Sequence, residues 1–522
     1  MVPPATPWRG TLKTFQKLAL TGLISLSAPA WASDFVDTRL SFVFADDNVL
    51  AGSGETTPNS PNARFGAGNQ NTQFYDNFNT RYSGFESLSN VVLYKRAPAF
   101  FEGLTTEAAL TLLVLERPSG NVDIRDNSSY IRLNYQPPGW GEKEGISLVG
   151  FPVSADRFRL GYAYRISWGG SGVFTTRSAA NGVPGGKLQI TRDKWYAYVG
   201  GKTALIQNEL ILEEETKYGI MAGAGWDILE TLRVEAGGGY FQKGLVPGLA
   251  TLGVEAPVNA AGVSGQVVYH VGVPVGTSVD FRLYKNDPDI YQRFFAPEQY
   301  PGGLSYTVSL EGSYLSQTLE KPNVFGATKP QGATAVALQA RAKYDLLRVS
   351  LLALYRSLSF IQFEVPGFPP FQDFPEGTEL KPEMFVALGA DYHLPKLHLT
   401  PGFIIGVQQP ASFRSPTPVL GGNNPPQHLI GTRTVVVRDV NQLSILPETC
   451  GRGSAVCRAE PIYSAKATFR WDLSESVAAV GEVYYTYDTN RTTFRDDVTG
   501  VAQPSFERPH ALGFNTLLQA RF

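Results

Sequence analysis

Fifteen Arg and Lys residues share the polar faces of alternating segments along this chain, and only seven carboxylates share those faces. Guanidinium forks hold carboxylates or phosphates through two parallel hydrogen bonds and stay charged at any relevant pH. The cations are Arg39, Arg132, Arg157, Arg159, Arg165, Arg233, Arg282, Arg341, Lys343, Arg348, Arg356, Lys396, Lys466, Arg470 and Arg521. The acids are Asp37, Glu107, Glu235, Asp280, Glu311, Asp391 and Glu482.

Two kinds of chemistry fit these polar faces. If they line confined water, the excess of cations raises the local concentration of anions, and this effect falls as salt rises. Such a lining favours anionic or hydroxylated solutes. Alternatively, opposite charges on neighbouring strands, for example around Arg233 and Glu235, form a ladder of cross-strand ion pairs that only stiffens the sheet. The sequence leaves both interpretations open.

The segments that carry these residues have a period of two. In 156–168, aromatic and aliphatic residues alternate with Arg, Gly, Ala and Ser, and the same alternation recurs at 335–345 and 463–471. Successive side chains of a strand point to opposite sides, so each segment predicts a ribbon with one apolar and one polar face.

The connections between these ribbons are of two lengths. Short ones follow an aromatic residue at Trp226, Tyr344, Tyr392 and Trp471. The long polar ones lie near 46–83, 169–186, 287–303, 361–380 and 409–460.

This arrangement predicts an all-β chain that forms a transmembrane antiparallel β-barrel, with short periplasmic turns and long extracellular loops. Hydrocarbon cannot satisfy an open sheet edge, so the sheet must close. The pattern gives nineteen segments, including 277–286, and an even number is required. We therefore expect about eighteen strands, with sixteen to twenty allowed. A soluble β-sandwich or propeller is the alternative, because alternation alone also fits an inward apolar core.

The N-terminal residues predict export. A cationic start, an apolar stretch at 18–26 and the small-residue site Ala30-Trp31-Ala32 are typical of a cleaved signal peptide, here residues 1–32. Residues 33–522 are then expected to form a single transmembrane barrel domain.

The last residues carry a family resemblance. Phe514, Leu518 and the terminal Phe522 lie on one face of an alternating segment. In this the chain resembles Gram-negative outer-membrane β-barrel proteins, whose last strand typically ends in an aromatic residue read by the barrel-assembly machinery. The resemblance implies insertion by that machinery, contact with outer-membrane lipids and a location in the cell outer membrane. It points to no particular transporter family.

The two cysteines, Cys450 and Cys457, enclose a short flexible segment. An exported chain meets oxidising conditions, so a disulfide is predicted, with two free thiols as the alternative. The five histidines show no metal-ligand spacing with this pair, and no cofactor or metal is expected.

These observations predict a transport function. A net charge of -2 argues against a nucleic-acid partner, and the absence of G-x-S-x-G, H-E-x-x-H and phosphate-loop motifs argues against an enzyme. We expect an outer-membrane pore for small polar, anionic or carbohydrate solutes, with a cation-lined lumen. The alternative is a structural or docking barrel of a trans-envelope assembly or polysaccharide export system, bound to envelope partner proteins.

Overall fold

The protein was analysed as a computed structural model of the whole chain. It describes residues 39–46, 48–50, 64–65, 90–97, 101–116, 122–126, 128–142, 144–155, 158–163, 166–170, 173–174, 182–272, 302–322, 324–363, 371–416, 432–439, 442–450, 456–496, 500 and 502–521. The predicted signal peptide lies outside these residues. Within them, no helix has the length and apolar character needed to cross a membrane.

Twenty strands form one antiparallel sheet. Two are short additions: β2 (Arg64–Phe65) pairs with β1, and β5 (Val122–Asp126) pairs with β4 beyond the part of β4 that pairs with β6. The other eighteen are β1 (Arg39–Asp46), β3 (Asn90–Ala97), β4 (Leu104–Glu116), β6 (Tyr130–Tyr135), β7 (Gly145–Phe151), β8 (Gly185–Thr191), β9 (Trp195–Asn208), β10 (Glu213–Leu229), β11 (Leu232–Leu245), β12 (Pro257–Val271), β13 (Leu304–Glu320), β14 (Thr328–Tyr344), β15 (Leu347–Arg356), β17 (Glu383–Tyr392), β18 (Leu399–Gln409), β22 (Ile462–Asp472), β23 (Val477–Tyr487) and β26 (His510–Arg521).

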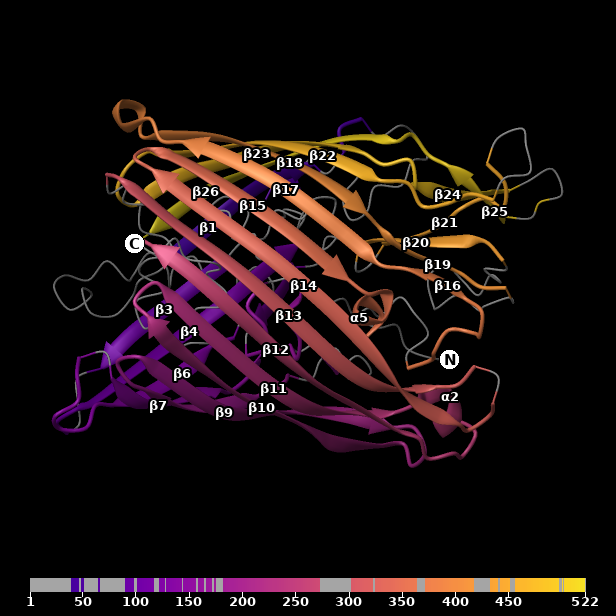
Figure 1. Cartoon of the computed structure of the whole chain (residues 1–522), viewed down its shortest axis with the longest axis horizontal. Coiled ribbons are helices and arrows are strands. Elements are labelled where there is room, and N and C mark those ends of the chain that lie inside the picture. The colour runs from indigo at the N-terminus through magenta and orange to yellow at the C-terminus, as the bar shows by residue number, and fades with distance from the viewer. Residues whose placement is uncertain are drawn as a thin grey trace, which may run out of the picture.

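The sheet closes on itself. Arg39 of β1 pairs with Arg521 of β26, so the first and last strands are neighbours, and β1 also contacts β3. The predicted transmembrane β-barrel is therefore confirmed, and its eighteen strands fall within the expected range. Figure 1 shows the tilted strands and the C-terminus at one end of the barrel.

The two ends of the barrel differ. The predicted short turns lie at 230–231, 345–346, 393–398 and 473–476, and the 3-10 helix η3 (Pro395–Leu397) forms part of the third. We call this end, which also holds the C-terminus, the short-turn end. At the opposite, long-loop end, Figure 1 shows the helices α2 (Pro247–Ala250) and α5 (Leu358–Gln362) and several small strands.

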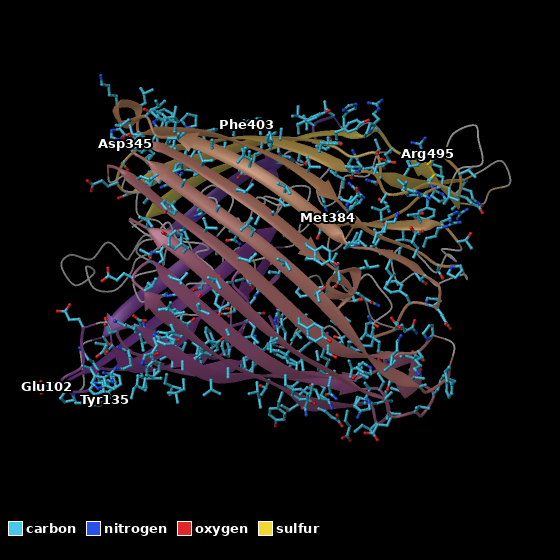
Figure 2. All side chains as sticks on the ribbon, in the orientation of Figure 1. Glu102, Tyr135, Asp345, Met384, Phe403 and Arg495 are labelled. Atoms are coloured by element: carbon cyan, nitrogen blue, oxygen red, sulfur yellow. A yellow bond between two sulfur atoms is a disulfide. The ribbon has the colours of Figure 1, made fainter. Side chains whose placement is uncertain are left out.

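The faces of the strands follow the sequence pattern. In β17, Met384, Val386 and Leu388 are exposed on the outside of the barrel, whereas Glu383 and Phe385 are buried inside. Figure 2 shows Met384 and Phe403 on the outer surface. Since an outward apolar side chain in a barrel of this kind meets acyl chains, the exposed hydrophobic residues need no protein partner.

One of the clearest predicted strands is wrong. The described residues of 156–168 do not form a wall strand; in the β7–β8 connection, 152–184, the described residues from Ala155 to Phe174 lie within the barrel and, apart from the half-buried Arg159, are buried. Alternation fixed the faces of the segment but not what the apolar face meets. Gly161 and Gly169, with φ of 100° and 80°, bend the chain where a strand would have to continue straight.

A second difference concerns the β12–β13 connection. These strands pair directly from Val271 and Tyr306 onward, so the connection 272–303 leaves from the short-turn end and not from the long-loop end. The strand ends that flank the predicted loop 287–303 therefore lie at the opposite rim from the one expected, and residues 287–301 lie outside the described residues. The predicted strand 277–286 itself, with Asp280 and Arg282, lies outside the described residues.

The long-loop end carries its own small sheets. Four strands, β16 (Glu379–Lys381), β19 (Ala411–Arg414), β20 (Thr434–Asp439) and β21 (Gln442–Ile445), form one, and β24 (Thr492–Asp496) pairs with β25 (Ala502–Phe506). Leu358 of α5, Phe413 and Val435 pack into a common apolar cluster beneath the first sheet. The described parts of the predicted loops 361–380 and 409–460 thus carry strands, a helix and an apolar cluster of their own.

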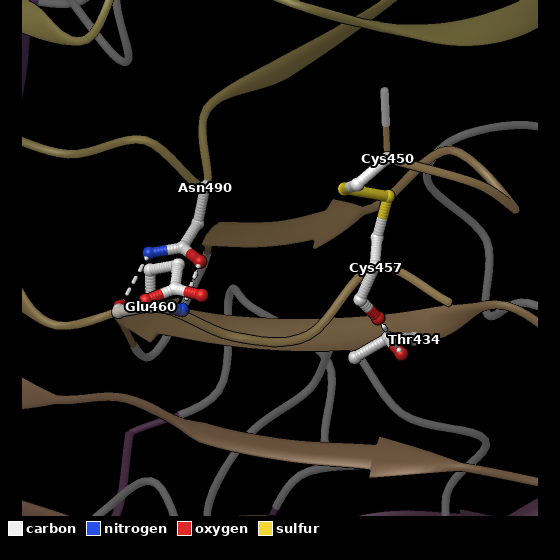
Figure 3. The surroundings of a disulfide bond; sticks show 5 residues. All are labelled: Thr434, Cys450, Cys457, Glu460 and Asn490. Carbon is white, nitrogen blue, oxygen red and sulfur yellow. Dashed lines mark hydrogen bonds between the residues drawn. A yellow bond between two sulfur atoms is a disulfide. The ribbon is translucent and has the colours of Figure 1, made fainter. Parts of the chain in front are cut away.

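The predicted disulfide is confirmed at this end. Cys450 and Cys457 are bonded with their Cα atoms 5.1 Å apart, and the Thr434 hydroxyl donates to the Cys457 carbonyl oxygen at 2.6 Å (Figure 3). The bridge therefore ties its short loop to strand β20.

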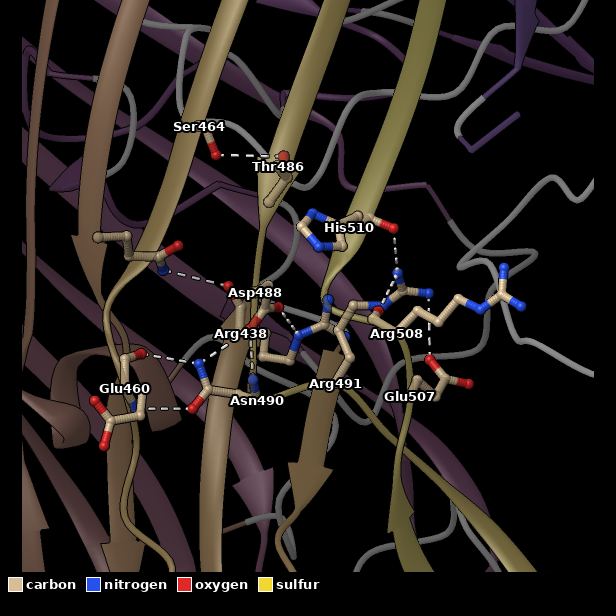
Figure 4. A network of polar contacts seen from close by, with 11 residues as sticks. Arg438, Glu460, Ser464, Thr486, Asp488, Asn490, Arg491, Glu507, Arg508 and His510 are labelled. Atoms are coloured by element: carbon tan, nitrogen blue, oxygen red, sulfur yellow. Dashed lines mark hydrogen bonds and ion pairs between the residues drawn. The ribbon is translucent and has the colours of Figure 1, made fainter. Parts of the chain in front are cut away.

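A polar network continues this bracing to the barrel mouth (Figure 4). Arg438 pairs with Asp488 at 2.5 Å, and Arg491 pairs with Glu507 at 3.2 Å. The Asn490 side chain accepts from the Glu460 N–H at 2.8 Å and donates to its carbonyl oxygen at 2.9 Å. These contacts join the β18–β22 and β23–β26 connections.

A charge placed on the outer face tests the membrane geometry. Leu310 of β13 is 53% exposed, and Leu304 is exposed on the same face at the short-turn rim. We expect Leu310→Arg to destabilise the barrel in lipid by about 2–4 kcal/mol and Leu304→Arg by about 0–1 kcal/mol, since the cost depends on depth. Denaturant unfolding in lipid vesicles measures both. Equal losses would contradict a membrane-spanning outer face.

Candidate functional site

The interior of the barrel is partly filled by the inner segment, our name for residues 152–184. Its described aromatic residues pack against the inward side of β9–β12. Trp168 donates from Nε1 to the Ser264 hydroxyl at 2.8 Å, and its ring meets Phe241 edge-on at 5.7 Å between centroids. Phe158 lies edge-on to Tyr198 at 6.1 Å. The alternating apolar residues of the sequence are thus core residues of the inner segment, which acts as a plug inside the barrel.

Lys202 of β9 anchors this segment through its backbone. Its ammonium, on a residue only 2% exposed, donates to the carbonyl oxygens of Ala155 and Gly169 at 2.8 and 2.7 Å and to that of Phe158. An irregular segment inside a barrel has carbonyl groups that no sheet partner satisfies, and each would be costly to bury alone. The Lys202 ammonium therefore satisfies three backbone carbonyl groups of the inner segment at once.

Glu311 of β13 provides the opposite anchor. Its two carboxylate oxygens accept hydrogen bonds from the backbone N–H groups of Tyr162 and Ala163 at 2.8 and 2.5 Å. Charge-assisted bonds of this kind are roughly twice as strong as neutral ones. The sequence predicted Glu311 to line a pore; the structure shows it holding the tip of the inner segment.

A hydroxyl and carboxylate cluster extends this anchor along the wall. The Tyr196 hydroxyl donates to Glu235 at 2.7 Å. Gln266 donates to the other Glu235 oxygen. Since Glu235 is 1% exposed, its charge is dispersed into these neutral partners and not into lumen water.

Inward glycines leave room for the inner segment. A Cβ on Gly200 would lie 2.6 Å from the Phe158 ring, and one on Gly237 or Gly239 would lie 2.8 or 2.9 Å from Leu160. A glycine inside a strand commonly marks the close approach of another part of the chain. The space that the inner segment occupies against the wall is therefore provided by the glycines of β9 and β11.

A second connection also folds against the inner wall. This is the β15–β17 connection, which contains Phe363 and Phe371. Lys243 of β11 donates to the Phe363 carbonyl oxygen at 2.9 Å and to the Gln317 side chain of β13 at 2.6 Å, and its ammonium lies over the Phe371 ring. Ser357 caps α5 by accepting from the Phe360 N–H at 3.3 Å. A buried lysine again holds an inward connection by its backbone.

The wall from β15 around to β6 carries ion pairs. Arg356 pairs with Glu383 at 2.5 Å and Lys466 with Glu482 at 2.9 Å, all four being buried. The further pairs are Arg132–Glu107 at 3.1 Å, Arg348–Asp391 at 2.7 Å and Arg470–Asp472 at 2.6 Å. Apart from Arg470–Asp472, which lies within β22, these pairs form the cross-strand ladder that was one of the two interpretations of the sequence.

The remaining predicted residues are distributed as follows. Arg233 pairs with Asp227 across the β10–β11 turn, at 2.5 Å, and Arg341 and Lys343 share the inward face of β14. Arg159 belongs to the inner segment, where it donates to the Ser167 hydroxyl at 3.4 Å. Lys396 lies in a short turn. The structure does not describe the side chains of the other predicted residues, which are Arg39, Arg157, Arg165, Asp280, Arg282, Arg521 and Phe522.

The sequence analysis missed three lysines that face the segments folded inside the barrel: Lys187 and Lys202 face the inner segment, and Lys243 faces the β15–β17 connection. Lys187, Lys202 and Lys243 are all buried on inward faces of β8, β9 and β11, yet none was selected. The usable signal was the inward glycines of these strands, which leave room for another segment of the chain beside a lysine. Among the described residues no group of three or more His, Cys, Asp or Glu side chains is placed to hold a metal ion.

The short-turn rim has one strongly perturbed carboxyl. Glu144 accepts from the Gly141 N–H at 2.8 Å, from Arg192 Nε at 2.9 Å and from the Asp193 N–H at 2.9 Å. These bonds, that of Gly141 first, lower the pKa of Glu144 to about 2. Arg192 also lies 4.1 Å over the Trp140 ring, so the β6–β7 and β8–β9 turns are held together.

Comparisons with known proteins give likeness of architecture only. No protein-family model matches the chain, and no curated protein matches its sequence. Among solved structures, the chain is similar to Wzi, an outer-membrane protein of Escherichia coli described as a carbohydrate-binding β-barrel, with 11% identity, 99% of this chain and 90% of that chain covered, and a TM-score of 0.40.

Two Pseudomonas aeruginosa structures are comparably similar. OpdQ shows 6% identity, with 94% of this chain and 98% of that chain covered and a TM-score of 0.41. The outer-membrane protein OprD shows 8% identity, with 95% of this chain and 96% of that chain covered and a TM-score of 0.40. The closed sheet and the outward apolar face of the chain themselves show a membrane-spanning β-barrel.

Removing the lysine anchor should release the plug without unfolding the barrel. Lys202→Met keeps the volume but leaves carbonyl groups of the inner segment unsatisfied, each costing about 1–3 kcal/mol. Hydrogen–deuterium exchange should then accelerate for the amides of Leu160 and Trp168, which bond each other's carbonyls at 2.8 and 2.7 Å. Lys466→Met, on the opposite wall, is the control and should leave that exchange unchanged. Unaltered protection in Lys202→Met would show that the anchor is dispensable.

The Glu144 clasp should give a defined pH profile. Its folded pKa of about 2 lies below the ordinary 4.5, so the carboxylate stabilises the folded barrel fully above about 4.5 and loses this contribution as pH falls toward 2. The stability difference between the wild type and Glu144→Gln, measured by unfolding in detergent, should shrink over that range. A difference that persists unchanged at the acid end contradicts the clasp.

Proposed function

We propose that this barrel is an outer-membrane channel whose passage is bounded by the inner segment. The observation that carries the proposal is the fixed position of that segment, anchored by Lys202 and Glu311 to the inside of β9 and β13. A barrel of this size has a lumen too wide for side chains alone to fill. A backbone segment held on one wall narrows it to a defined channel beside the opposite wall.

The charges of the lining set the class of solute. Of the ten predicted cations whose side chains the structure describes, six lie in ion pairs with carboxylates at 3.1 Å or less. Paired charges give little net attraction for anions but offer donors and acceptors side by side. We therefore favour small neutral hydroxylated solutes, of the carbohydrate kind, over anions.

One observation favours a second candidate, a structural or docking barrel. The long-loop end is braced by the disulfide, the Arg438–Asp488 pair and the four-stranded sheet β16–β19–β20–β21. Such bracing suits a surface that binds an envelope partner protein or an exported polysaccharide. It does not require that solutes pass through the barrel.

The assembly signal remains part of the proposal. Phe514 and Leu518 lie on the outward side of β26, with Leu518 exposed. An outward apolar stripe on the last strand is accessible to the barrel-assembly machinery before closure against β1. It then lies against outer-membrane lipids.

Planar-bilayer recordings separate the two functions. For a channel we expect small single-channel steps with a cation-to-anion permeability ratio near unity, because the lining charges are paired. Replacing residues 156–181 by a short Gly/Ser linker should increase the conductance severalfold. No conductance from either protein contradicts the channel and supports the docking barrel. A strong anion preference would contradict the neutral-solute assignment alone.

A further inference from the structure

The tip of the inner segment has the geometry of an anion site. Gly161 has a φ of 100°, and the two N–H groups that follow it, those of Tyr162 and Ala163, converge on one carboxylate at 2.8 and 2.5 Å. Successive backbone N–H groups in such a bend form a nest that binds anions. Two parallel donors match the two oxygens of a carboxylate particularly well.

We propose that residues 161–163 form a carboxylate-binding site, that Glu311 is its resident ligand, and that a small free carboxylate can take its place. The proposal deepens the proposed function, since it assigns the contact that positions the inner segment. It does not depend on conduction, because the site is defined by its own hydrogen bonds. Glu311 is thus a positioning residue.

Gly161 is specifically required by this site. A Cβ at this position would lie 2.7 Å from the Ser167 Cα and 3.0 Å from a Glu311 carboxylate oxygen. Its positive φ is also one that other residues rarely adopt. The bend that aims both N–H groups at Glu311 therefore needs glycine for two independent reasons.

The resident carboxylate has a large advantage over a free one. Glu311 lies on a rigid strand and is 2% exposed, so its carboxylate is already oriented at the nest. Tethering of this kind gives a high effective concentration, which free ions in the wild type cannot match. The exchange should therefore become visible only when the tethered group is removed.

The variant Glu311→Ala removes the tethered carboxylate and leaves a space of the size and shape of a small carboxylate ion. The atoms removed, the γ-carbon and the carboxyl group, correspond to one acetate ion. Acetate should therefore refill the nest and restore the contacts of Tyr162 and Ala163. Acetamide has the same shape without the charge and offers only one acceptor oxygen, so it should not.

Thiol labelling in the folded barrel provides the test. Val173 is a buried residue of the inner segment, and the chain's two native cysteines are bonded to each other. In a Val173→Cys background, Glu311→Ala should raise the alkylation rate by a small neutral maleimide at least about tenfold, the factor for loss of one charge-assisted bond. Acetate, titrated at constant ionic strength with chloride, should return the rate toward that of the parent.

Three controls give each outcome a meaning. Glu107→Ala, in the same background, removes a carboxylate from the Arg132 pair and should leave the rate unchanged. Glu311→Gln, which keeps the side-chain volume, should also raise the rate, and gel mobility of the unheated protein shows that each barrel is folded. Equal protection by acetamide or chloride, or no rise in either Glu311 variant, overturns the proposal. Acetate rescue in a barrel that never conducts would sustain the site and refute only the channel.

Discussion

The constraint on which this structure depends is that hydrocarbon offers no hydrogen bonds to a backbone. A chain that crosses the membrane as strands must therefore close its sheet, and β26 pairs with β1 along eight consecutive residues to do so. In the described strands the apolar outward face then meets lipid, and the polar side chains lie on the inward face together with the apolar residues that pack against the inner segment. The same constraint then reappears inside, where the inner segment brings irregular backbone into a place with few sheet partners.

The protein meets this inner problem with charged side chains aimed at backbone groups. Lys202 satisfies carbonyl groups and Glu311 satisfies N–H groups, so the two anchors are complementary in sign and in the atoms they hold. Buried charges are expensive unless such partners are supplied. The inner segment and its anchors therefore stabilise each other, and neither is suited to the lumen alone.

The sequence predicts the wall far better than its contents. The periods at 335–345 and 463–471 became β14 and β22, and the short turns after Trp226, Tyr344 and Trp471 are where the aromatics placed them. In these segments one face must meet lipid, so a local pattern is sufficient. The interior has no such uniform partner, and its contacts join residues about 150 positions apart, as with Ala163 and Glu311.

Residues 156–168 show why the same pattern can mislead. Phe158 and Trp168 alternate with polar residues as a lipid-facing strand would, yet both are buried inside the barrel. A buried plug and a membrane strand both require an apolar face, so periodicity cannot distinguish them. The difference lies in Gly161 and Gly169, which interrupt the segment, and in the inward glycines Gly200 and Gly237, which receive it. Complementary glycines in two distant segments are thus the feature that identifies an inward connection, because a wall strand gains nothing from either set.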